Sequence, residues 1–355
     1  MLKRPVHGGN LAWAAALAGC SPSAILDFSA SINPLGAPRS AIAAIQNSLD
    51  LLREYPDPEY AALRSALGKF HQISPEWILP GNGAAELLTW ACWDLAKLEV
   101  TYLLTPAFSD YFRALKAFGA KIDRCPLKMQ GNRSKFKIQN EKLSLQGAGF
   151  LLNNPHNPTG RLFTRESILP YLEEFSLVVV DEAFMDFLTP DRQQSLIDAV
   201  QNYPNLVILR SLTKFYSLPG LRIGYAIAHP DRLNEWQQRR DPWSVNVLAE
   251  IAAIAMLRDT VFQHQTWDWL ASAKPLLFSG LEQLPGLQPL PSAANFFLVK
   301  TEQSSSEIQR QLLERFRILI RDCLSFAELG DRYFRVAVRS RDENQRLVES
   351  LTKIL

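Results

Sequence analysis

Short apolar segments dominate the middle of the chain and alternate with amphipathic ones. The strand-like runs, most of them nearly continuous in apolar residues, are 77–80, 100–105, 121–127, 149–154, 177–183, 206–211 and 222–228. Continuous apolar runs are typical of strands that are buried on both faces of a sheet. Stretches between them, such as 84–97 and 109–119, have the spacing of amphipathic helices. The pattern predicts βαβ units, an α/β fold and a mainly parallel seven-stranded sheet.

The pattern changes near residue 270. A helix-like stretch (268–284), three short strand candidates (295–300, 318–322 and 333–338) and a final helix (342–355) predict a compact α+β unit. We therefore expect a large domain over 41–265 and a small C-terminal domain over 266–355. The first 40 residues have no place in the sheet, and we expect segment 1–40 to pack with the small domain and over the active site.

The N-terminus allows two interpretations. Lys3 and Arg4 precede LAWAAALAGC, which looks like a short secretory leader ending at Cys20. The same residues form a helix with Asn10 as N-cap and Gly19 beyond its end, which is the interpretation we favour. No apolar run approaches the roughly 18 residues of a membrane span, so we expect no membrane insertion.

The charge balance and the cysteine positions argue against several classes of binding partner and site. Of 355 residues, 38 are Lys or Arg and 36 are Asp or Glu, and this near balance argues against binding to nucleic acid or to a membrane surface. The cysteines Cys20, Cys92, Cys125 and Cys323 are far apart and form no C-x-x-C pair. We therefore expect no zinc site, no disulfide framework and a cytoplasmic location with reduced thiols.

Residues just after each strand are candidates for ligand binding, because ligands of open α/β sheets bind beyond the carboxyl ends of the strands. The run GNGAAE follows the first strand, and the N–H groups of Gly83, Ala84 and Ala85 at a helix start suit a phosphate. The run PHNPTG follows 149–154, and its Asn157 is either a turn former or an amide held at the edge of a site.

Two charged residues end neighbouring buried strands. Asp181 is either a helix N-cap or a buried acid with a cationic partner, because an unpaired charge there would be costly. Lys214 is either a lysine that reaches the surface or a desolvated, nucleophilic amine. Ser211, Thr213 and Arg222 surround Lys214 in sequence and add hydroxyls and a guanidinium suited to phosphate.

One cofactor accounts for this set of residues. Pyridoxal 5'-phosphate needs a lysine for its aldehyde, an acid that keeps its ring nitrogen protonated and donors for its phosphate. Lys214 and Asp181 supply the first two, and the phosphate donors are Gly83, Ala84, Ala85, Ser211, Thr213 and Arg222. Phe108 is placed to stack on the ring, with a core aromatic as the alternative, and Asn157 is placed to donate to the phenolic oxygen of the ring.

The motifs GNGAAE, NNPHNPTG, VVVDEAF and SLTKFYSLPGLRIGY, in this order, resemble the fold-type I aminotransferase superfamily, in particular its histidinol-phosphate aminotransferase-like branch. The resemblance runs from HGGN (7–10) to FRVAVRS (334–340). It implies the aminotransferase fold type I and a homodimer in which Tyr55 of one subunit reaches the cofactor phosphate of the other. The substrate-binding residues that it implies are His7, Gly8, Ser31, Asn33, Asn157, Arg321 and Arg335.

Within this branch, the terminal motifs resemble the members that act in cobalamin synthesis. They imply decarboxylation of L-threonine O-3-phosphate to (R)-1-amino-2-propanol O-2-phosphate, with Arg321 and Arg335 on the phosphate. The alternative activity is that of a histidinol-phosphate aminotransferase, which shares the cofactor residues. The sequence departs from the resemblance at two positions. Phe184 stands where the superfamily often has Tyr, and the decarboxylating members also have Phe there. Ser31 stands where those members usually have Asn. A third hypothesis is a non-catalytic, cofactor-bearing regulatory module.

Overall fold

The computed structural model describes residues 4–128, 138 and 145–355. Its largest element, which we call the large sheet, has the strand order β2-β8-β7-β6-β5-β3-β4. Neighbours from β7 to β4 are parallel, and β8 is antiparallel to both β2 and β7. The prediction of a mainly parallel seven-stranded sheet is confirmed within the described residues.

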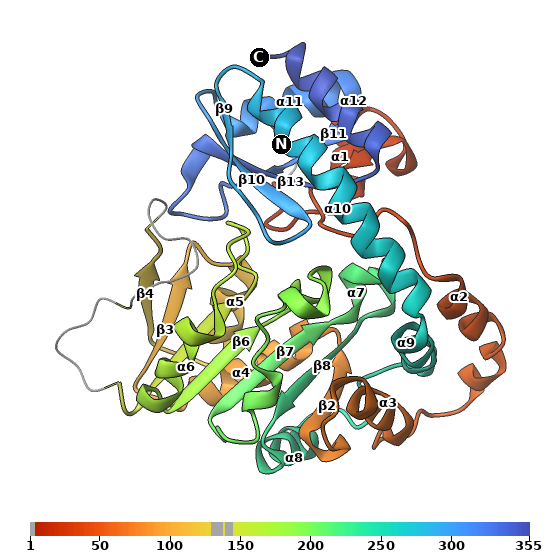
Figure 1. The fold of residues 1–355 in the computed structure, drawn as a ribbon, viewed down its shortest axis with the longest axis vertical. Helices are drawn as coiled ribbons and strands as arrows, with labels where there is room; N and C mark the ends of the chain where they lie inside the picture. Colours follow the sequence, from red (N-terminus) through yellow and green to blue (C-terminus); the bar gives the residue numbers. More distant parts are fainter. Residues whose placement is uncertain (1–3, 129–137, 139–144) are drawn as a thin grey trace.

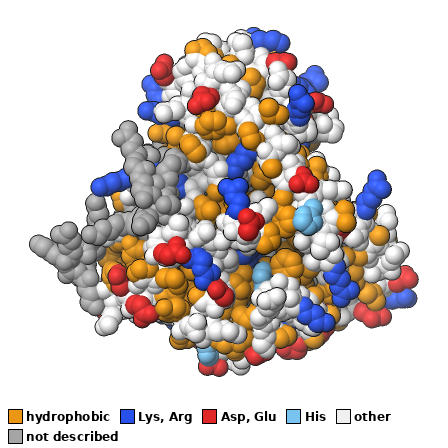
Figure 2. All heavy atoms as spheres, viewed as in Figure 1, with side chains coloured by type: hydrophobic (Ala, Val, Ile, Leu, Met, Phe, Trp, Pro, Cys, Tyr) orange, Lys and Arg blue, Asp and Glu red, His pale blue; other side chains and the backbone are white. Residues whose placement is uncertain are grey.

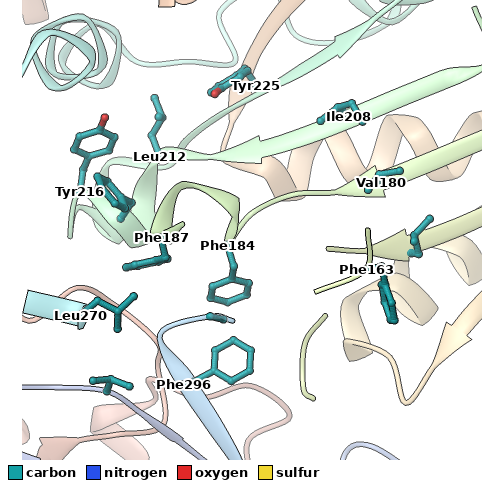
Figure 3. Packing of buried hydrophobic residues seen from close by; sticks show 14 of the residues in the cluster. Phe163, Val180, Phe184, Phe187, Ile208, Leu212, Tyr216, Tyr225, Leu270 and Phe296 are labelled. Atoms are coloured by element: carbon teal, nitrogen blue, oxygen red, sulfur yellow. The ribbon is translucent and has the colours of Figure 1, made fainter. Parts of the chain in front are cut away.

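Each predicted strand of the large sheet is present. Their bounds are β2 (Ile78–Asn82), β3 (Val100–Thr105), β4 (Ile122–Pro126), β5 (Ala148–Asn153), β6 (Leu177–Asp181), β7 (Leu206–Ser211) and β8 (Ile223–Ala228). The two faces of the sheet pack into different apolar clusters, so neighbouring residues of a strand serve opposite faces. Val179 and Val207 belong to one cluster, whereas Val180 and Ile208 belong to the other. Figure 3 shows Val180 and Ile208 together with Tyr225 on this second face.

A second, smaller sheet contains the C-terminal strands in the order β12-β13-β10-β9. Its strands are β9 (Leu287–Pro289), β10 (Phe296–Thr301), β12 (Arg321–Asp322) and β13 (Tyr333–Ala337). The predicted strand 318–322 is divided, because β11 (Ile318–Leu319) leaves this sheet and pairs in parallel with β1 (Leu26–Asp27). The N-terminal segment is therefore hydrogen-bonded to the C-terminal part of the chain.

Helices surround both sheets, as Figure 1 shows. They are α1 (Leu11–Ala18), α2 (Arg39–Gln46), α3 (Ala61–His71), α4 (Ala84–Leu95), α5 (Ser109–Ala117), α6 (Arg165–Glu174), α7 (Leu212–Phe215), α8 (Pro230–Arg239), α9 (Val247–Arg258), α10 (Thr260–Glu282), α11 (Ser305–Phe316) and α12 (Arg341–Thr352). The long helix α10 runs from the large sheet toward the small one (Figure 1). The predicted boundary at residues 265 and 266 falls inside it, and the division into 1–40, 41–265 and 266–355 stays a prediction.

The N-terminal helix α1 has the predicted ends. The side chain of Asn10 accepts a hydrogen bond from the Trp13 N–H (3.0 Å), and Gly19 follows the helix with φ 60°. The left-handed conformation at this position favours glycine, because glycine has no Cβ. Lys3 lies outside the described residues. In the described ranges, none of the helices is long and apolar enough to cross a membrane.

Candidate active site

The carboxyl ends of the parallel strands meet at one edge of the large sheet, and this edge faces the small sheet (Figure 1). Asp181 ends β6, Ser211 ends β7 and the loop with Asn157 follows β5. Residues that are far apart in the sequence thus share one site. Figure 2 shows several Lys and Arg side chains near the middle of this view, where the two parts of the molecule meet.

Lys214 lies in the first turn after β7, on the short helix α7. Its Nζ is 3.4 Å from Ser211 Oγ and 5.1 Å from the centre of the Phe184 ring. Burial lowers the pKa of the Lys214 amine, and Arg222 and Arg335 lower it further, whereas Asp181 opposes the shift. A lowered pKa increases the fraction of neutral amine, which is the form that attacks an aldehyde.

Asp181 faces the same side of the large sheet as Val179 and accepts two hydrogen bonds. Tyr111 Oη donates to its Oδ2 (2.7 Å), and the Ala183 N–H donates to its Oδ1 (2.9 Å). Donors of this kind stabilise the ionised carboxylate. The arrangement suits an acid that must keep a ring nitrogen protonated.

The predicted phosphate site is tightly built. Gly83 precedes α4 with φ 75°, and a Cβ added to it would lie 2.5 Å from Nη2 of Arg222. The guanidinium of Arg222 is therefore directly beside the start of α4. The Gly83 N–H donates to the carbonyl of Gly81 (2.7 Å), so this predicted donor is already engaged. Ala84 and Ala85 lie in the first helical turn, where amides have no acceptor within the helix.

Hydroxyl groups complete this phosphate site. Ser211 Oγ and Thr213 Oγ1 are 2.9 Å apart, and both residues are buried. A guanidinium, two hydroxyls and a helix N-terminus form a donor set that favours a phosphate dianion. The residues present therefore fit pyridoxal 5'-phosphate, with Lys214 for the aldehyde, Asp181 for the ring nitrogen and this set for the phosphate.

Phe108 immediately precedes α5 and is only partly buried. Its ring meets the ring of Tyr111 edge-on, with centroids 5.7 Å apart, and the ring of His7 at 5.3 Å. His7 Nδ1 is also 3.5 Å from Ser109 Oγ, and burial lowers the pKa of this histidine. The N-terminal segment therefore reaches the large-sheet side of the site.

Arg335 and Arg321 occupy opposite positions on the paired strands β13 and β12. Arg335 Nη1 donates to Asn157 Oδ1 (2.5 Å), a contact between the small sheet and the loop after β5. Its Nη2 donates to the Ser29 carbonyl (3.1 Å). Burial and Arg321 lower the pKa of Arg335 to about 10, so it remains charged at neutral pH. Two neighbouring guanidinium groups favour an anion beside them.

Arg321 holds the N-terminal segment. Its guanidinium donates to the carbonyls of Pro5 and Val6, and to Ser325 Oγ at 2.6 Å. Burial lowers the pKa of Arg321 as well. The predicted anion clamp is thus built partly from the segment that carries His7 and Gly8.

The remaining predicted substrate residues are close to these groups. A Cβ on Gly8 would lie 2.3 Å from the Ser29 carbonyl oxygen, so this close approach requires glycine. Ser31 is buried, and its carbonyl accepts from Asn295 Nδ2 (3.1 Å). The amide of Asn33 donates to the Phe215 carbonyl and to Thr266 Oγ1, both at 2.8 Å. Asn33 therefore supports α7 beneath Lys214, and its contact with substrate stays a prediction.

Tyr55 lies apart from these residues. It is 80% exposed, and its ring is 4.5 Å from that of Trp243. Its predicted contact with a partner subunit stays a prediction.

Three important residues were not predicted from the sequence. Tyr111 contacts Asp181, and its signal was a phenol on a buried helix face, which usually needs a hydrogen-bond partner. Glu182 and Arg210 form a buried ion pair (2.9 Å) on the opposite face of the sheet. A charged residue within each of two apolar strands was the available signal.

Among the described residues, no group of three or more His, Cys, Asp or Glu side chains is placed to hold a metal ion.

Comparison with known proteins identifies the class of protein. A family model described as aminotransferase class I and II matches residues 23–351, so the chain belongs to this family. Enzymes of this family depend on pyridoxal phosphate, in agreement with the residues at the strand ends.

Individual proteins of this family are similar to the chain along most of its length. The chain is 39% identical to the threonine-phosphate decarboxylase of Salmonella typhimurium, over 98% of this chain and 96% of that protein. It is 31% identical to an adenosylcobalamin biosynthesis bifunctional protein of Leptospira interrogans, over 99% of this chain and 41% of that protein. A histidinol-phosphate aminotransferase of Mannheimia succiniciproducens is 32% identical, over 94% of this chain and 90% of that protein.

Solved structures agree on the fold. The L-threonine-O-3-phosphate decarboxylase of Porphyromonas gingivalis has a TM-score of 0.83 and 26% identity, covering 93% of this chain and 99% of that one. The histidinol-phosphate aminotransferase of Clostridium acetobutylicum gives the same values. The fold is therefore common to a decarboxylase and an aminotransferase, and only local chemistry separates them.

Proposed function

We propose that the chain is a pyridoxal phosphate-dependent threonine-phosphate decarboxylase that makes (R)-1-amino-2-propanol O-2-phosphate for cobalamin synthesis. The observation that carries the proposal is the 39% identity to the Salmonella enzyme along nearly the whole length of both chains. Identity to the histidinol-phosphate aminotransferase is lower, at 32%. The relationship to a cobalamin biosynthesis protein supports the proposed pathway.

The cofactor, when bound, supplies an electron sink for the pair released from a Cα bond of the substrate. Lys214 would hold its aldehyde carbon, because the amine is desolvated and lies at the centre of the site. Asp181 would hold the proton on the ring nitrogen. Phe184 contributes an apolar surface 5.1 Å from the Lys214 amine, where a tyrosine would add a hydroxyl. Phe184 also packs edge-on against Phe296 of β10, as Figure 3 shows.

The basic residues of the small sheet determine how the substrate lies. Arg321 and Arg335 would bind the substrate phosphate, because they are adjacent, buried and positively charged. Asn157 and the segment with His7, Gly8 and Ser31 would then orient the carboxylate. Holding the substrate carboxylate in this way would select its bond to Cα as the one that breaks, with carbon dioxide as the leaving group and the electron pair taken up by the cofactor. Lys214 Nζ would hold the proton that replaces carbon dioxide at Cα.

A homodimer is part of the proposal. Exposed apolar side chains precede Tyr55 in sequence, namely Leu49, Leu51 and Leu52, and the exposed Trp243 lies beside the Tyr55 ring. Grouped exposed apolar residues of this kind indicate an interface. Tyr55 would then reach the cofactor phosphate of the partner subunit. Sedimentation equilibrium at micromolar concentration tests the dimer, and a monomer would contradict it.

We also propose a cytoplasmic location. The described residues include the four cysteines Cys20, Cys92, Cys125 and Cys323 as free thiols, which suits a reducing compartment. Cell fractionation with an antibody against the chain tests this location.

Incubation of the purified holoenzyme with O-phospho-L-threonine tests the function. We expect stoichiometric carbon dioxide and an aminopropanol phosphate, with no 2-oxo acid. Borohydride treatment should attach the cofactor covalently to Lys214, and the Lys214→Ala variant should lose this labelling. The exposed residue Lys69 provides a matched control, because Lys69→Ala should retain labelling and turnover. Amino-group transfer from histidinol phosphate to 2-oxoglutarate, without carbon dioxide release, would replace the proposal by the aminotransferase.

A further inference from the structure

The hydroxyl of Tyr111 lies in the apolar layer between α5 and the large sheet. Tyr111 is 1% exposed and belongs to the cluster that contains Leu88, Cys92 and Val179. Its Oη donates to Asp181 Oδ2 at 2.7 Å. Burial and the neighbouring carboxylate raise the pKa of Tyr111 well above 10. The hydroxyl therefore stays protonated and always acts as a donor to Asp181.

This contact fixes the carboxylate in two ways. Together with the Ala183 N–H on Oδ1, Tyr111 gives each oxygen of Asp181 a donor and restricts rotation of the group. The donated hydrogen bond also stabilises the ionised form of the acid. An acid that must share a proton with a ring nitrogen is sensitive to both effects.

The ring of Tyr111 has a second role. It supports Phe108 edge-on, with the centroids 5.7 Å apart and the planes at 87°. Phe108 is the aromatic residue predicted to stack on the cofactor. A single side chain on α5 thus contacts both the acid and the aromatic platform.

We propose that Tyr111 is a positioning residue of the cofactor site, which acts through Asp181 to keep the ring of the cofactor positively charged. The inference rests on the proposed function, because it assumes that Asp181 contacts the ring nitrogen. It assigns Tyr111 no contact with the substrate.

The experiment compares Tyr111→Phe with Tyr225→Phe in the holoenzyme. Tyr225 is equally buried, and its hydroxyl bonds to His71 Nε2 (2.7 Å) on the opposite face of the same sheet. Both variants lose one buried hydroxyl, so thermal unfolding should report similar losses of stability. Only Tyr111→Phe should change the cofactor site.

Two measurements on bound cofactor distinguish positioning from packing. The dissociation constant of pyridoxal phosphate should rise about tenfold in Tyr111→Phe, the scale of one lost hydrogen bond to a charged group. The midpoint of the pH titration, followed by the absorbance of the bound cofactor, should move to higher pH. A less positive ring withdraws fewer electrons and leaves the Lys214 nitrogen more basic.

A double variant tests the route through Asp181. Adding Tyr111→Phe to Asp181→Asn should have little further effect on cofactor affinity, because both changes remove the same interaction. Additive effects, or a Tyr111→Phe protein with the wild-type titration and affinity, would overturn the inference. A wild-type chain that fails to bind the cofactor would instead contradict the proposed function. If Tyr111→Phe cannot fold, the hydroxyl is a core determinant and the positioning role is wrong.

Discussion

Asp181 and Glu182 are adjacent carboxylates that occupy opposite faces of one sheet. Asp181 points toward the site and is only partly buried, with Tyr111 and a backbone amide as donors. Glu182 is completely buried and pairs with Arg210 at 2.9 Å. Burial raises the pKa of Glu182, and Arg210 opposes this shift. Strand alternation thus places consecutive carboxylates on opposite faces, one at the candidate site and one in a buried ion pair.

Glu182 belongs to a buried ion cluster around Arg210. Arg210 also bonds to Asp186 (2.5 Å), and Ser195 Oγ lies between Arg210 and Glu182. Buried charges are costly unless they are paired, and this cluster gives the Arg210 guanidinium two carboxylates and a hydroxyl. A charged residue at the end of a buried strand therefore indicates chemistry only if its face of the sheet is open to a ligand.

The largest expected effect is on turnover, from Asp181→Asn. The rate with O-phospho-L-threonine should fall about a hundred- to a thousandfold, the range found when a group that stabilises developing charge is removed. The free energy of unfolding should change by less than about 1 kcal/mol, because the amide keeps the shape of the acid. Steady-state kinetics and urea unfolding measure the two effects. A large loss of stability with normal turnover would show that Asp181 is structural, like Glu182.

Glu182→Gln should have the reverse effect. Loss of one partner leaves Arg210 incompletely paired, and we expect the free energy of unfolding to fall by about 3–5 kcal/mol. The absorbance of bound cofactor and the KM for substrate should stay close to those of the wild type at low temperature. Glu307→Gln is the control, since its pair with Arg310 is exposed to solvent and should contribute little to stability. A Glu182→Gln protein of normal stability would show that the ion cluster is not structural.

His156 extends the comparison to the loop after β5, where His156 is buried and its neighbour Asn157 contacts Arg335. Burial and Arg161 lower the pKa of His156 to about 3. The unfolded chain therefore binds a proton near pH 6.5 that the folded chain excludes, and stability falls as the pH drops from about 6.5 toward 3.

This linkage has a measurable size. Between pH 6.5 and pH 5, His156 should account for about 2 kcal/mol of lost stability. In His156→Gln, this part of the pH dependence should disappear, whatever the stability of the variant at pH 7. Urea unfolding at both pH values measures it. An equal pH dependence in the two proteins would contradict a buried neutral His156.

The smallest expected effect comes from Gly83→Ala. The new Cβ would lie 2.5 Å from Arg222 Nη2, and the backbone of Gly83 (φ 75°, ψ 161°) adds about 1–3 kcal/mol of strain, because residues with a Cβ rarely adopt it. Displacing Arg222 should raise the cofactor dissociation constant about tenfold. Gly119→Ala is the matched control, because Gly119 also has a positive φ (71°), with no atom within 4 Å of an added Cβ. Equal losses of affinity in both variants would assign the effect to strain alone.

The sequence predicted much of the fold and of the cofactor site. Most strands of the large sheet were recognisable because strands buried on both faces are continuously apolar, as in Val178–Val180, whereas the edge strand β4 carries Asp123 and Arg124 and is largely exposed. Lys214 and Asp181 were recognisable because charges directly after such strands are unusual. The split at Ile320, with β11 and β12 in different sheets, was not recognisable, because a pairing partner leaves no local pattern.

The strands, the capped helix α1 and the residue types that suit a phosphate-bearing cofactor follow from the sequence, because periodicity and residue chemistry are local properties. Three contacts appear only in the folded chain: Tyr111 donates to Asp181, Arg335 donates to Asn157, and Asn33 donates to the Phe215 carbonyl. These contacts join residues up to 182 positions apart. Such pairings depend on how strands and helices pack, and that packing is a property of the whole chain.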